Sequence, residues 1–490
     1  MSVSSTGEMK VSARAVQAVA SPVVVAVVRT LALVLVARGA HLHLRRRHAR
    51  RRHPARAVTV AAALGVLLLG CSASDSTTAI EDGGRSSAET PSATPTSSGA
   101  TLALGEELRV DPQYYPPLLD PEQPPPAMPP LDVTSTSGVQ PGTVVFTTYT
   151  SPRVTADQPY HPSFLIELDK QSGELTKAQQ MLTPATMFQP EPDGRYSYNI
   201  VDKSGVNGAG FEVTHYVTDA ELAVTEAFNL DELEGGDADL HDFELLDNGN
   251  ALVLAYRRRQ VDLTEFGGPA YGLVWDTVIA ERTPHGETVW EWDGADHMDL
   301  EDVPAQVAKE QLTSDPPAVA DYAHPNSLEV FPDGDVLVSI RHYDCLYRID
   351  RDTGDIEWTF GGRYCVDNEF DISGDPVDGP SHQHDATLLD NGNILLFDNG
   401  NLHDERLSRV VEYAVDEEEK TAELVWSYDD GRYTPIMGSA ERLENGNTLI
   451  GWGALVDPVI TEVTSDGEEV FSLSLPPGQL VYRAYQGGQD

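Results

Sequence analysis

The chain has 490 residues and a formal net charge of −45, from 33 Lys and Arg against 78 Asp and Glu. Eleven of the basic residues lie within residues 1–70 beside a single acid, Glu8, so the rest of the chain is more acidic still. Phosphate binding requires a basic face, and we therefore expect no nucleic-acid partner. The length is sufficient for one large all-β domain, and the acidity favours solubility.

The first predicted segment, residues 1–71, is an export region. A basic stretch at residues 45–52 precedes the apolar run Ala57–Leu69, which is too short for a comfortable transmembrane helix. The run ends in a sequence that resembles the lipobox of bacterial lipoproteins, Leu68-Leu69-Gly70-Cys71. The resemblance implies that Cys71 is lipidated and anchors the exported protein to the outer face of the bacterial cell membrane. An ordinary signal peptide cut nearby is the alternative, and the true start codon stays open.

The second predicted segment, residues 72–138, is rich in Ser, Thr, Pro and Gly, a composition typical of a disordered tether. Two cysteines follow it, Cys345 and Cys365, and in an exported protein they are expected to form a disulfide. Two free thiols are the alternative. No histidine pair lies at ligand spacing beside these cysteines, so we expect no metal site there.

A glycine-containing turn recurs six times in residues 139–490, each time after a strand-like run. The turn glycines are spaced 52 to 58 residues apart, except for one interval of 85, and are Gly142, Gly194, Gly249, Gly334, Gly392 and Gly446. Four of the turns read almost alike, as in Asp247-Asn248-Gly249-Asn250 and Asp390-Asn391-Gly392-Asn393. The Asp and Asn residues are interpreted as turn residues that tolerate positive φ, because the spacing is too short for a twelve-residue calcium loop.

Each repeat combines an inner hairpin with an outer strand–turn–strand unit, and two hairpins make a four-stranded blade. The inner hairpins are clearest over 241–256, 326–340 and 384–397. Several outer units end in an apolar-x-Trp pattern, as at Trp292, Trp358 and Trp426. A period of this size with β patterning predicts an all-β fold, a six-bladed β-propeller of four-stranded antiparallel blades over residues 139–490. The long interval contains an insertion within 257–322, interpreted as a loop that covers one face.

Histidines mark the start of the inner runs in three of the repeats. His241 and His384 occupy the same position, six residues before the first Asp of the turn. His324 and His382 each lie two residues before that position in their own repeats. Because the first strand of each propeller blade lines the central channel, residues that enter it from one side converge on one face. We therefore expect these histidines to surround a single axial pocket.

The strand that returns from each turn ends beside the start of the first strand. Arg341 follows such a strand and is expected beside His324, and Asn399 is expected beside His384 by the same reasoning. Asn326 is in register with His241. A pocket with several histidines and one arginine is cationic inside a very acidic protein. It suits an anionic group, whose oxygens an arginine binds with forked hydrogen bonds.

Four runs resemble those of bacterial arylsulfate sulfotransferases, which are six-bladed propellers. They are residues 324–327, 339–342, 383–385 with 391–393, and 438–443. The resemblance extends over roughly residues 140–485. It implies that His384 is a nucleophile that takes a sulfuryl group, and that His241, His324 and Arg341 hold the sulfuryl oxygens. Asn326, His382 and Asn399 are expected to contact substrate. His382 is also a second candidate nucleophile.

The activity implied is transfer of a sulfuryl group from an aryl sulfate to a phenol, by a ping-pong reaction through a sulfohistidine and without an adenylyl-sulfate donor. The phosphate-cradling G-x-x-x-x-G-K-[ST] loop is absent, and so is the Cys/Ser-x-Pro-x-Arg motif of metal-dependent sulfatases. No cofactor is expected. A non-catalytic surface propeller that binds anionic or glycan ligands is the main alternative, and a sulfate-ester hydrolase is a third. The oligomeric state stays open.

Overall fold

The computed structural model describes residues 128–150, 162–181, 183–203, 212–229, 236–313, 319–454 and 457–488. These belong to one compact unit. The predicted export region, with Cys71, and most of the predicted tether lie outside the described residues. No helix among the described residues is long and apolar enough to cross a membrane.

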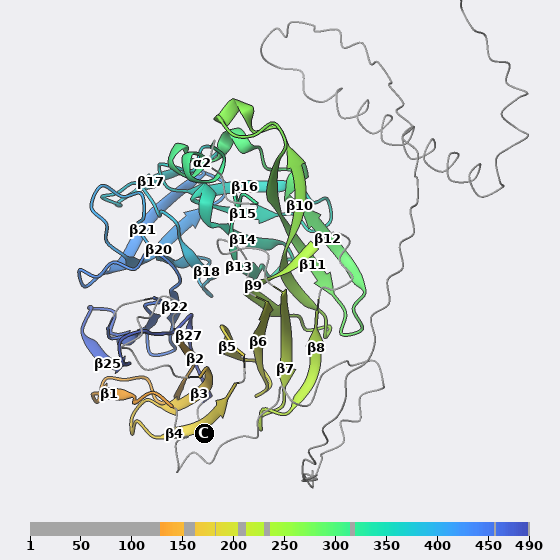
Figure 1. Cartoon of the computed structure of the whole chain (residues 1–490). Helices are drawn as coiled ribbons and strands as arrows, with labels where there is room; N and C mark the ends of the chain where they lie inside the picture. The colour runs from red at the N-terminus through yellow and green to blue at the C-terminus, as the bar shows by residue number, and fades with distance from the viewer. Residues whose placement is uncertain are drawn as a thin grey trace, which may run out of the picture. The chain divides into compact units, whose positions relative to one another are not determined.

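Six separate sheets of four or five strands form the blades of a propeller, which confirms the predicted fold class (Figure 1). Within each blade, successive strands run from the channel outward and pair in antiparallel fashion, apart from one added edge strand. Blade 1 contains β2 (Thr143–Thr150), β3 (Phe164–Asp169) and β4 (Leu175–Gln180). Blade 2 contains β5 (Phe188–Pro190), β6 (Tyr196–Lys203), β7 (Glu212–Thr218) and β8 (Val224–Phe228). Blade 3 contains β9 (Gly236–Leu245), β10 (Ala251–Val261), β11 (Gly272–Arg282) and β12 (Thr288–Asp293).

Blades 4 to 6 repeat this arrangement. Blade 4 contains β13 (Pro325–Val330), β14 (Val336–Ile340), β15 (Cys345–Ile349) and β16 (Ile356–Gly361). Blade 5 contains β18 (His384–Leu388), β19 (Ile394–Asp398), β20 (Arg409–Asp416) and β21 (Thr421–Tyr428). Blade 6 contains β22 (Ser439–Arg442), β23 (Thr448–Gly451), β24 (Ile460–Val463) and β25 (Glu469–Ser474). The edge strand β17 (Asp371–Ser373) lies parallel to β21.

The repeated turns have the conformation that their sequence predicts. All six turn glycines adopt positive φ, between 80° and 115°. In three turns the last Asn extends to a glutamate on the third strand: Asn250 to Glu281, Asn393 to Glu412 and Asn447 to Glu462, at 2.5 to 2.7 Å. The turn motif therefore closes the inner hairpin and also ties it to the next strand outward.

The tryptophans of the outer units connect neighbouring blades. Trp292 Nε1 donates to the carbonyl oxygen of Gly354, in the β15–β16 turn of blade 4, at 3.1 Å. Trp426 Nε1 donates to the carbonyl oxygen of Ser465, in the corresponding turn of blade 6, at 3.0 Å. Each such contact fixes the position of one blade against the next.

The ring is closed by the C-terminal end of the chain, which the sequence did not indicate. β26 (Gln479–Leu480) and β27 (Ala484–Gln486) pair with β2, so the innermost strand of blade 1 comes from the far end of the domain. At the other end, β1 (Asp132–Ser135) pairs with β25 as a fifth strand of blade 6. This strand lies within the stretch expected to be tether, so the ordered domain extends N-terminally of residue 139.

The expected loop over 257–322 is largely regular structure instead. β10 and β11 remain paired as a hairpin as far as Val261 and Gly272. The last residues of β10 alternate between partly buried and exposed, a pattern that suits a strand extending beyond the blade. Short 3₁₀-helices (Thr264–Phe266, Gly294–Asp296, Leu300–Asp302) and α2 (Ala305–Gln311) follow along the chain. Val307 and Leu312 are buried in the same core cluster as Leu252 and Val338, so this segment belongs to the core of blades 3 and 4.

The predicted disulfide is present between Cys345 and Cys365, which are 20 residues apart in the sequence. Cys345 is the first residue of β15, and Cys365 lies in the segment that leads from blade 4 to blade 5. Both are buried. A further short 3₁₀-helix, Arg341–Tyr343, lies between β14 and Cys345, close to the predicted pocket residues.

Candidate active site

The structure brings the predicted histidines and Arg341 together at one end of the channel. The His241 and His324 rings are 4.6 Å apart between centroids. The backbone N–H of Arg341 donates to the carbonyl of His324 at 3.1 Å, as the return of β14 beside β13 requires. His342, which was not among the predicted site residues, lies between His324 and His382, with ring centroids at 4.8 and 5.7 Å.

The backbone is held in an unusual conformation at two of these histidines. His324 and His382 both have φ of 56°, a left-handed conformation that non-glycine residues rarely adopt. They occupy equivalent positions, each two residues before the channel-lining residue of its blade. Strained residues of this kind persist where the surrounding structure holds them, and they concentrate at functional sites.

Three of the histidines are oriented by buried carboxylates. Nδ1 of His241 and of His382 lies 2.8 Å from Asp239 and Asp344 respectively, and His324 Nδ1 bonds Asp321. A carboxylate only accepts hydrogen bonds, so in each case Nδ1 carries the proton and Nε2 presents a lone pair. His342 Nδ1 lies 2.7 Å from the carbonyl of Asp321, which assigns the same tautomer to it.

His384 differs because its partner is a neutral amide. Its Nδ1 lies 2.5 Å from Oδ1 of Asn399. The Asn399 Nδ2 donates to the carbonyls of Thr434 at 2.8 Å and Met437 at 2.9 Å, so the orientation of the amide is decided by its partners. Oδ1 therefore faces His384, Nδ1 is the donor, and Nε2 is left with a lone pair.

Four of the imidazoles, those of His324, His342, His382 and His384, are kept neutral by their surroundings. Burial and the positive charge of Arg341 lower the pKa of His384 and of His382 well below 6.5. Burial likewise lowers the pKa of His324 and His342 well below that value. Neutral imidazoles with free Nε2 atoms are nucleophiles and bases, and the charged arginine among them supplies the attraction for an anion.

Arg341 is buried yet incompletely bonded. Its Nη2 donates to the carbonyl of Pro435 at 2.8 Å, while its Nε has no hydrogen-bond partner among the described residues. Burial lowers the pKa of Arg341 to about 10, which still leaves it charged at neutral pH. An unpaired donor on a buried cation is costly unless an acceptor binds it, and the oxygen of an anionic ligand is such an acceptor.

Asn326 makes its described contacts within the protein. It is fully buried, and its Nδ2 donates to the carbonyl of Gln383, the residue between His382 and His384, at 2.7 Å. It thereby fixes the start of β18 against β13. Its expected contact with substrate stays a prediction.

Two residues near the C-terminal end of the domain, Tyr482 and Arg483, support the residues around the histidines. Arg483 forms buried ion pairs with Asp242 at 3.3 Å and Asp385 at 3.0 Å, and it donates to the carbonyl of Asn326 at 2.6 Å. Tyr482 donates to the carbonyl of His241 at 3.1 Å. Neither Tyr482 nor Arg483 was predicted, because the repeat pattern does not place the C-terminus in the ring.

Two further site residues were not predicted, although their spacing from a histidine in the sequence could have indicated them. Asp239 lies two residues before His241 and Asp321 three before His324, which is the short spacing at which a carboxylate can orient an imidazole. Asp344 left no such signal, because it reaches His382 from 38 residues away.

One group of side chains is close enough to hold a metal ion. Among the described residues, ligand atoms of Asp321, His324 and His342 lie within 4.8 Å of one another. In both imidazoles, however, Nδ1 is already hydrogen-bonded to Asp321. His324 bonds its carboxylate, and His342 bonds its backbone carbonyl. These hydrogen bonds account for the proximity of the three residues.

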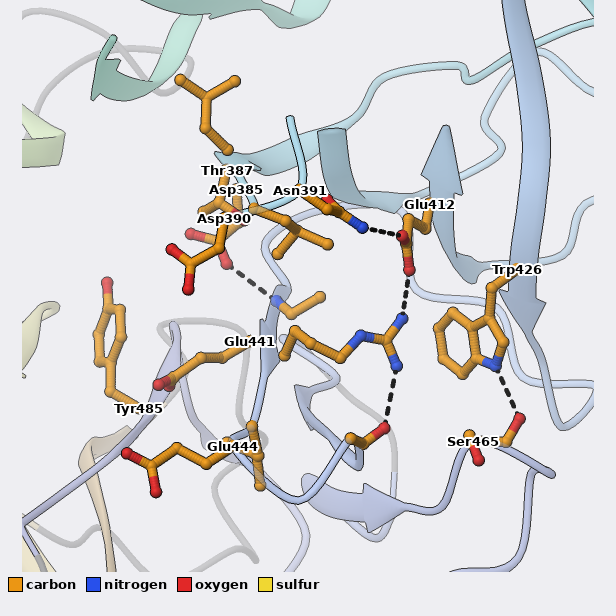
Figure 2. A pocket seen from close by; sticks show the side chains of 16 residues that line it. Asp385, Thr387, Asp390, Asn391, Glu412, Trp426, Glu441, Glu444, Ser465 and Tyr485 are labelled. Atoms are coloured by element: carbon orange, nitrogen blue, oxygen red, sulfur yellow. Dashed lines mark hydrogen bonds and ion pairs between the residues drawn. The ribbon is translucent and has the colours of Figure 1, made fainter. Parts of the chain in front are cut away.

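A separate cavity of about 750 Å³ lies between blades 5 and 6 (Figure 2). Its lining includes Asp390 and Glu444, from the turns at the far ends of β18 and β22, and none of the pocket histidines. Burial raises the pKa of Glu441, which also lines it, to about 7. The other acids of its lining make this cavity unsuited to anions.

The fold and site thus define a six-bladed propeller with an axial cluster of imidazoles and one buried arginine. A sequence profile of the family described as arylsulfotransferase (ASST) matches residues 223–483, which include every histidine and arginine of this pocket. That match spans more than half of the chain, and the chain belongs to the arylsulfotransferase family.

Two curated relatives share the same printed name, arylsulfate sulfotransferase AssT. The one from Lelliottia amnigena is 30% identical over 145 residues, which is 24% of this chain and 23% of the relative. The one from Escherichia coli O6:H1 is 31% identical over 104 residues, 19% of this chain and 16% of the relative. The matched segments thus span less than a quarter of either relative.

Among solved structures, this chain is similar to a protein of unknown function from Bacteroides caccae, with a TM-score of 0.42 and 12% sequence identity. The alignment covers 70% of this chain and 98% of that protein. Another is the periplasmic gluconolactonase PpgL of Pseudomonas aeruginosa, with a TM-score of 0.39 and 12% identity, covering 71% of this chain and all of that one.

Proposed function

We propose that the protein transfers a sulfuryl group from an aryl sulfate to a phenol, with His384 as the nucleophile and no adenylyl-sulfate donor. The observation that carries this proposal is the pairing of His384 with Asn399 near a buried arginine whose Nε has no hydrogen-bond partner in the described part of the chain. Family membership supports the reaction class, and the contacts within the pocket support the roles of the individual residues.

In the first half-reaction the lone pair of His384 Nε2 attacks sulfur, and the N–S bond forms as the S–O bond to the aryl group breaks. The electron pair leaves with the phenolate oxygen. Arg341 stabilises the negative charge on the sulfuryl oxygens, and His241 and His324 line the same space. Such a loose, in-line transfer depends on positioning and charge stabilisation.

In the second half-reaction the oxygen of an acceptor phenol attacks sulfur, and the N–S bond electrons return to Nε2. The phenol proton passes to the Nε2 of a neighbouring imidazole and from there to solvent, while the phenolate released in the first half-reaction takes a proton from solvent. The reaction therefore balances and follows ping-pong kinetics.

The neutral partner of His384 favours it over His382 as the nucleophile. A carboxylate, as on His382, stabilises the cationic ring of an N-sulfo-imidazole and so slows its breakdown. An amide oxygen fixes the tautomer without adding a negative charge. His382, paired with Asp344, is better suited to accept the proton of the acceptor phenol.

The test is the mass of the intact protein after brief incubation with para-nitrophenyl sulfate. We expect an increase of one sulfuryl group in the wild type and none in His384→Ala, with His382→Ala still labelled. Labelling that survives in His384→Ala but not in His382→Ala would move the nucleophile to His382. Nitrophenol release at a rate that is independent of acceptor indicates a hydrolase. The absence of labelling and of turnover indicates a binding propeller.

We also propose that the chain is exported and lipid-anchored through Cys71. The support is the sequence of residues 45–71 alone. Incorporation of labelled palmitate by the wild type and not by Cys71→Ser tests it. A Cys71→Ser chain that remains labelled and membrane-bound contradicts it.

A further inference from the structure

Each of the pocket histidines His241 and His384 is followed by a buried aspartate that reaches the next blade. Asp242 accepts from a backbone N–H of β13 in blade 4, and Asp385 accepts from one of β22 in blade 6, both at 2.8 Å. Both aspartates lie seven residues before the glycine of their turn. They are therefore equivalent residues, and each ties the strand of one histidine to the blade beyond it.

Serines occupy the same position in blades 4 and 6 and make the same kind of contact. Ser327 accepts from a backbone N–H of β18 at 3.1 Å, and Ser439 accepts from one of β27 at 3.0 Å. One side chain per blade thus joins blade 3 to blade 4, and so on to the C-terminal strand that closes the ring. We call Asp242, Ser327, Asp385 and Ser439 the belt.

The pairing of the strands is interrupted where the two aspartates lie. The register of β10 with β9 shifts between Val253 and Ala255, and that of β18 with β19 shifts after His384. Asp385 itself has a φ of 52°, in the left-handed region. An irregularity of this kind releases a strand from its neighbour and re-aims its side chains. The placement of the two histidines therefore depends on the side-chain contacts that follow them.

Arg483 joins the two aspartates of the belt. Its Nη1 lies 3.3 Å from Asp242 and 3.0 Å from Asp385, and its Nη2 donates to the carbonyl of Asn326 at 2.6 Å. One guanidinium therefore contacts β9, β13 and β18 beside the histidines. The rigid fork of an arginine fixes such partners more tightly than a flexible amine can. Because two carboxylates balance its charge, we expect Arg483 to act on the pocket through position and not through charge.

We propose that Arg483 is a positioning residue of the reaction, which holds His384 in place relative to His241 through the aspartate that follows each histidine. The inference rests on the proposed function. His384 attacks sulfur while His241 lines the same space, so both rings must be in place at once. A misplacement of about 1 Å can lower the rate of such a reaction about 100-fold. Arg483 is buried and bonded to the protein, so its effect on the rate passes through Asp242 and Asp385.

Arg483→Lys keeps a positive charge beside the aspartates but loses the planar fork that holds both of them and the carbonyl of Asn326. We expect kcat with para-nitrophenyl sulfate and a phenol to fall by about 10- to 100-fold. The Ki of inorganic sulfate should stay within about twofold, because Arg341 is held separately by the carbonyl of Pro435. An unchanged kcat, or a Ki that rises by the same factor as kcat falls, overturns the proposal.

Positioning is separated from a purely structural role by restoring stability without the arginine. In Arg483→Met/Asp242→Asn/Asp385→Asn the buried charges are gone, and the amide oxygens can still accept from the backbone N–H groups. We expect the midpoint of denaturation to recover towards the wild type while kcat stays at least about tenfold lower. A kcat that recovers together with the midpoint contradicts the proposal.

The matched control is Lys170→Met, which breaks the buried pair of Lys170 with Glu462 of blade 6 at 2.6 Å. It should lower the midpoint of denaturation and leave kcat unchanged at a temperature where the protein is folded. A kcat that falls as far as in the Arg483 variants shows that any lost buried pair slows the reaction, and the proposal fails.

Crystal structures of the wild type and of the triple variant decide the proposal without turnover. The His384 ring should shift by roughly 1 Å relative to His241 when Arg483 is gone. Histidines that superimpose in the two structures overturn the proposal. If the wild type turns over no aryl sulfate, the proposed function fails, and the comparison of the structures still decides whether Arg483 positions the two histidines.

Discussion

Asn399 links the candidate nucleophile to the segment that borders the pocket: its oxygen accepts from His384 at 2.5 Å, and its nitrogen donates to the carbonyls of Thr434 and Met437. One amide thereby fixes both the tautomer of the imidazole and the position of the pocket edge. Asparagine and glutamine are the side chains that carry an amide, with an N–H donor and an oxygen acceptor on one carbon, and glutamine is one methylene longer.

Asn399→Asp is expected to lower kcat at least about 100-fold, because the nucleophile loses its neutral partner and two backbone carbonyls lose their donor. The added carboxylate should also raise the pKa of His384. The acid limb of the kcat profile should therefore move to higher pH. Asn401→Asp is the matched control, since Asn401 binds the same segment without touching His384. A profile that moves equally in both variants contradicts the assignment.

The wild-type enzyme should remain active on the acid side of neutrality. Burial and Arg341 lower the pKa of His384 well below 6.5, so the imidazole stays unprotonated as the pH falls through 6.5. We expect kcat/KM with para-nitrophenyl sulfate to be flat between about pH 6 and 7. A half-loss of activity centred at pH 6.5 indicates an ordinary, solvated histidine instead.

Loss of the disulfide should affect activity more than β content. Cys345 directly follows Asp344, which accepts from both the backbone N–H and Nδ1 of His382. The double variant Cys345→Ser/Cys365→Ser should lose about 3 kcal/mol of unfolding free energy, the value for a loop of about this length. At a temperature where circular dichroism shows a folded protein, turnover should still fall severalfold. An equal loss of the two signals on heating indicates that the disulfide acts on global stability alone.

Arg483 should be essential for stability, because it is the buried cation between two buried carboxylates. Arg483→Met is expected to lower the free energy of unfolding by about 3–5 kcal/mol, since Asp242 and Asp385 are left unpaired. Adding Asp242→Asn and Asp385→Asn should recover part of the loss. Arg195→Met, which breaks a partly exposed pair with Asp193, is the control and should cost at most about 1 kcal/mol in a denaturant titration.

The fold was predictable because its signals are local. Each Asn-Gly turn specifies a hairpin within a dozen residues, and each outer Trp binds the adjacent blade, so the repeat reports its own architecture. Ring closure was not predictable in this way, because β27 pairs with β2 from the opposite end of the domain and no local motif links the two strands.

The same distinction applies to the candidate site. His241, His324 and Arg341 could be placed because equivalent positions in different blades meet at the axis. Asp344 and Met437 could not be placed in this way. Asp344 approaches His382 across a blade boundary, and Met437, which precedes blade 6, contacts Tyr149 of blade 1. Contacts between elements that share no repeat position have no sequence period to reveal them.

The closure of the ring by β27 has a consequence for the order in which the site is assembled. Tyr482 and Arg483, which contact the residues around the pocket, follow the strands of all six blades in the sequence, and they take their places only when the first and last blades are joined. A nascent chain can form blades 2 to 5 one after another, complete with every pocket histidine, and still have no enclosed pocket. Competence for chemistry therefore depends on the step that closes the ring, which follows synthesis of all six blades.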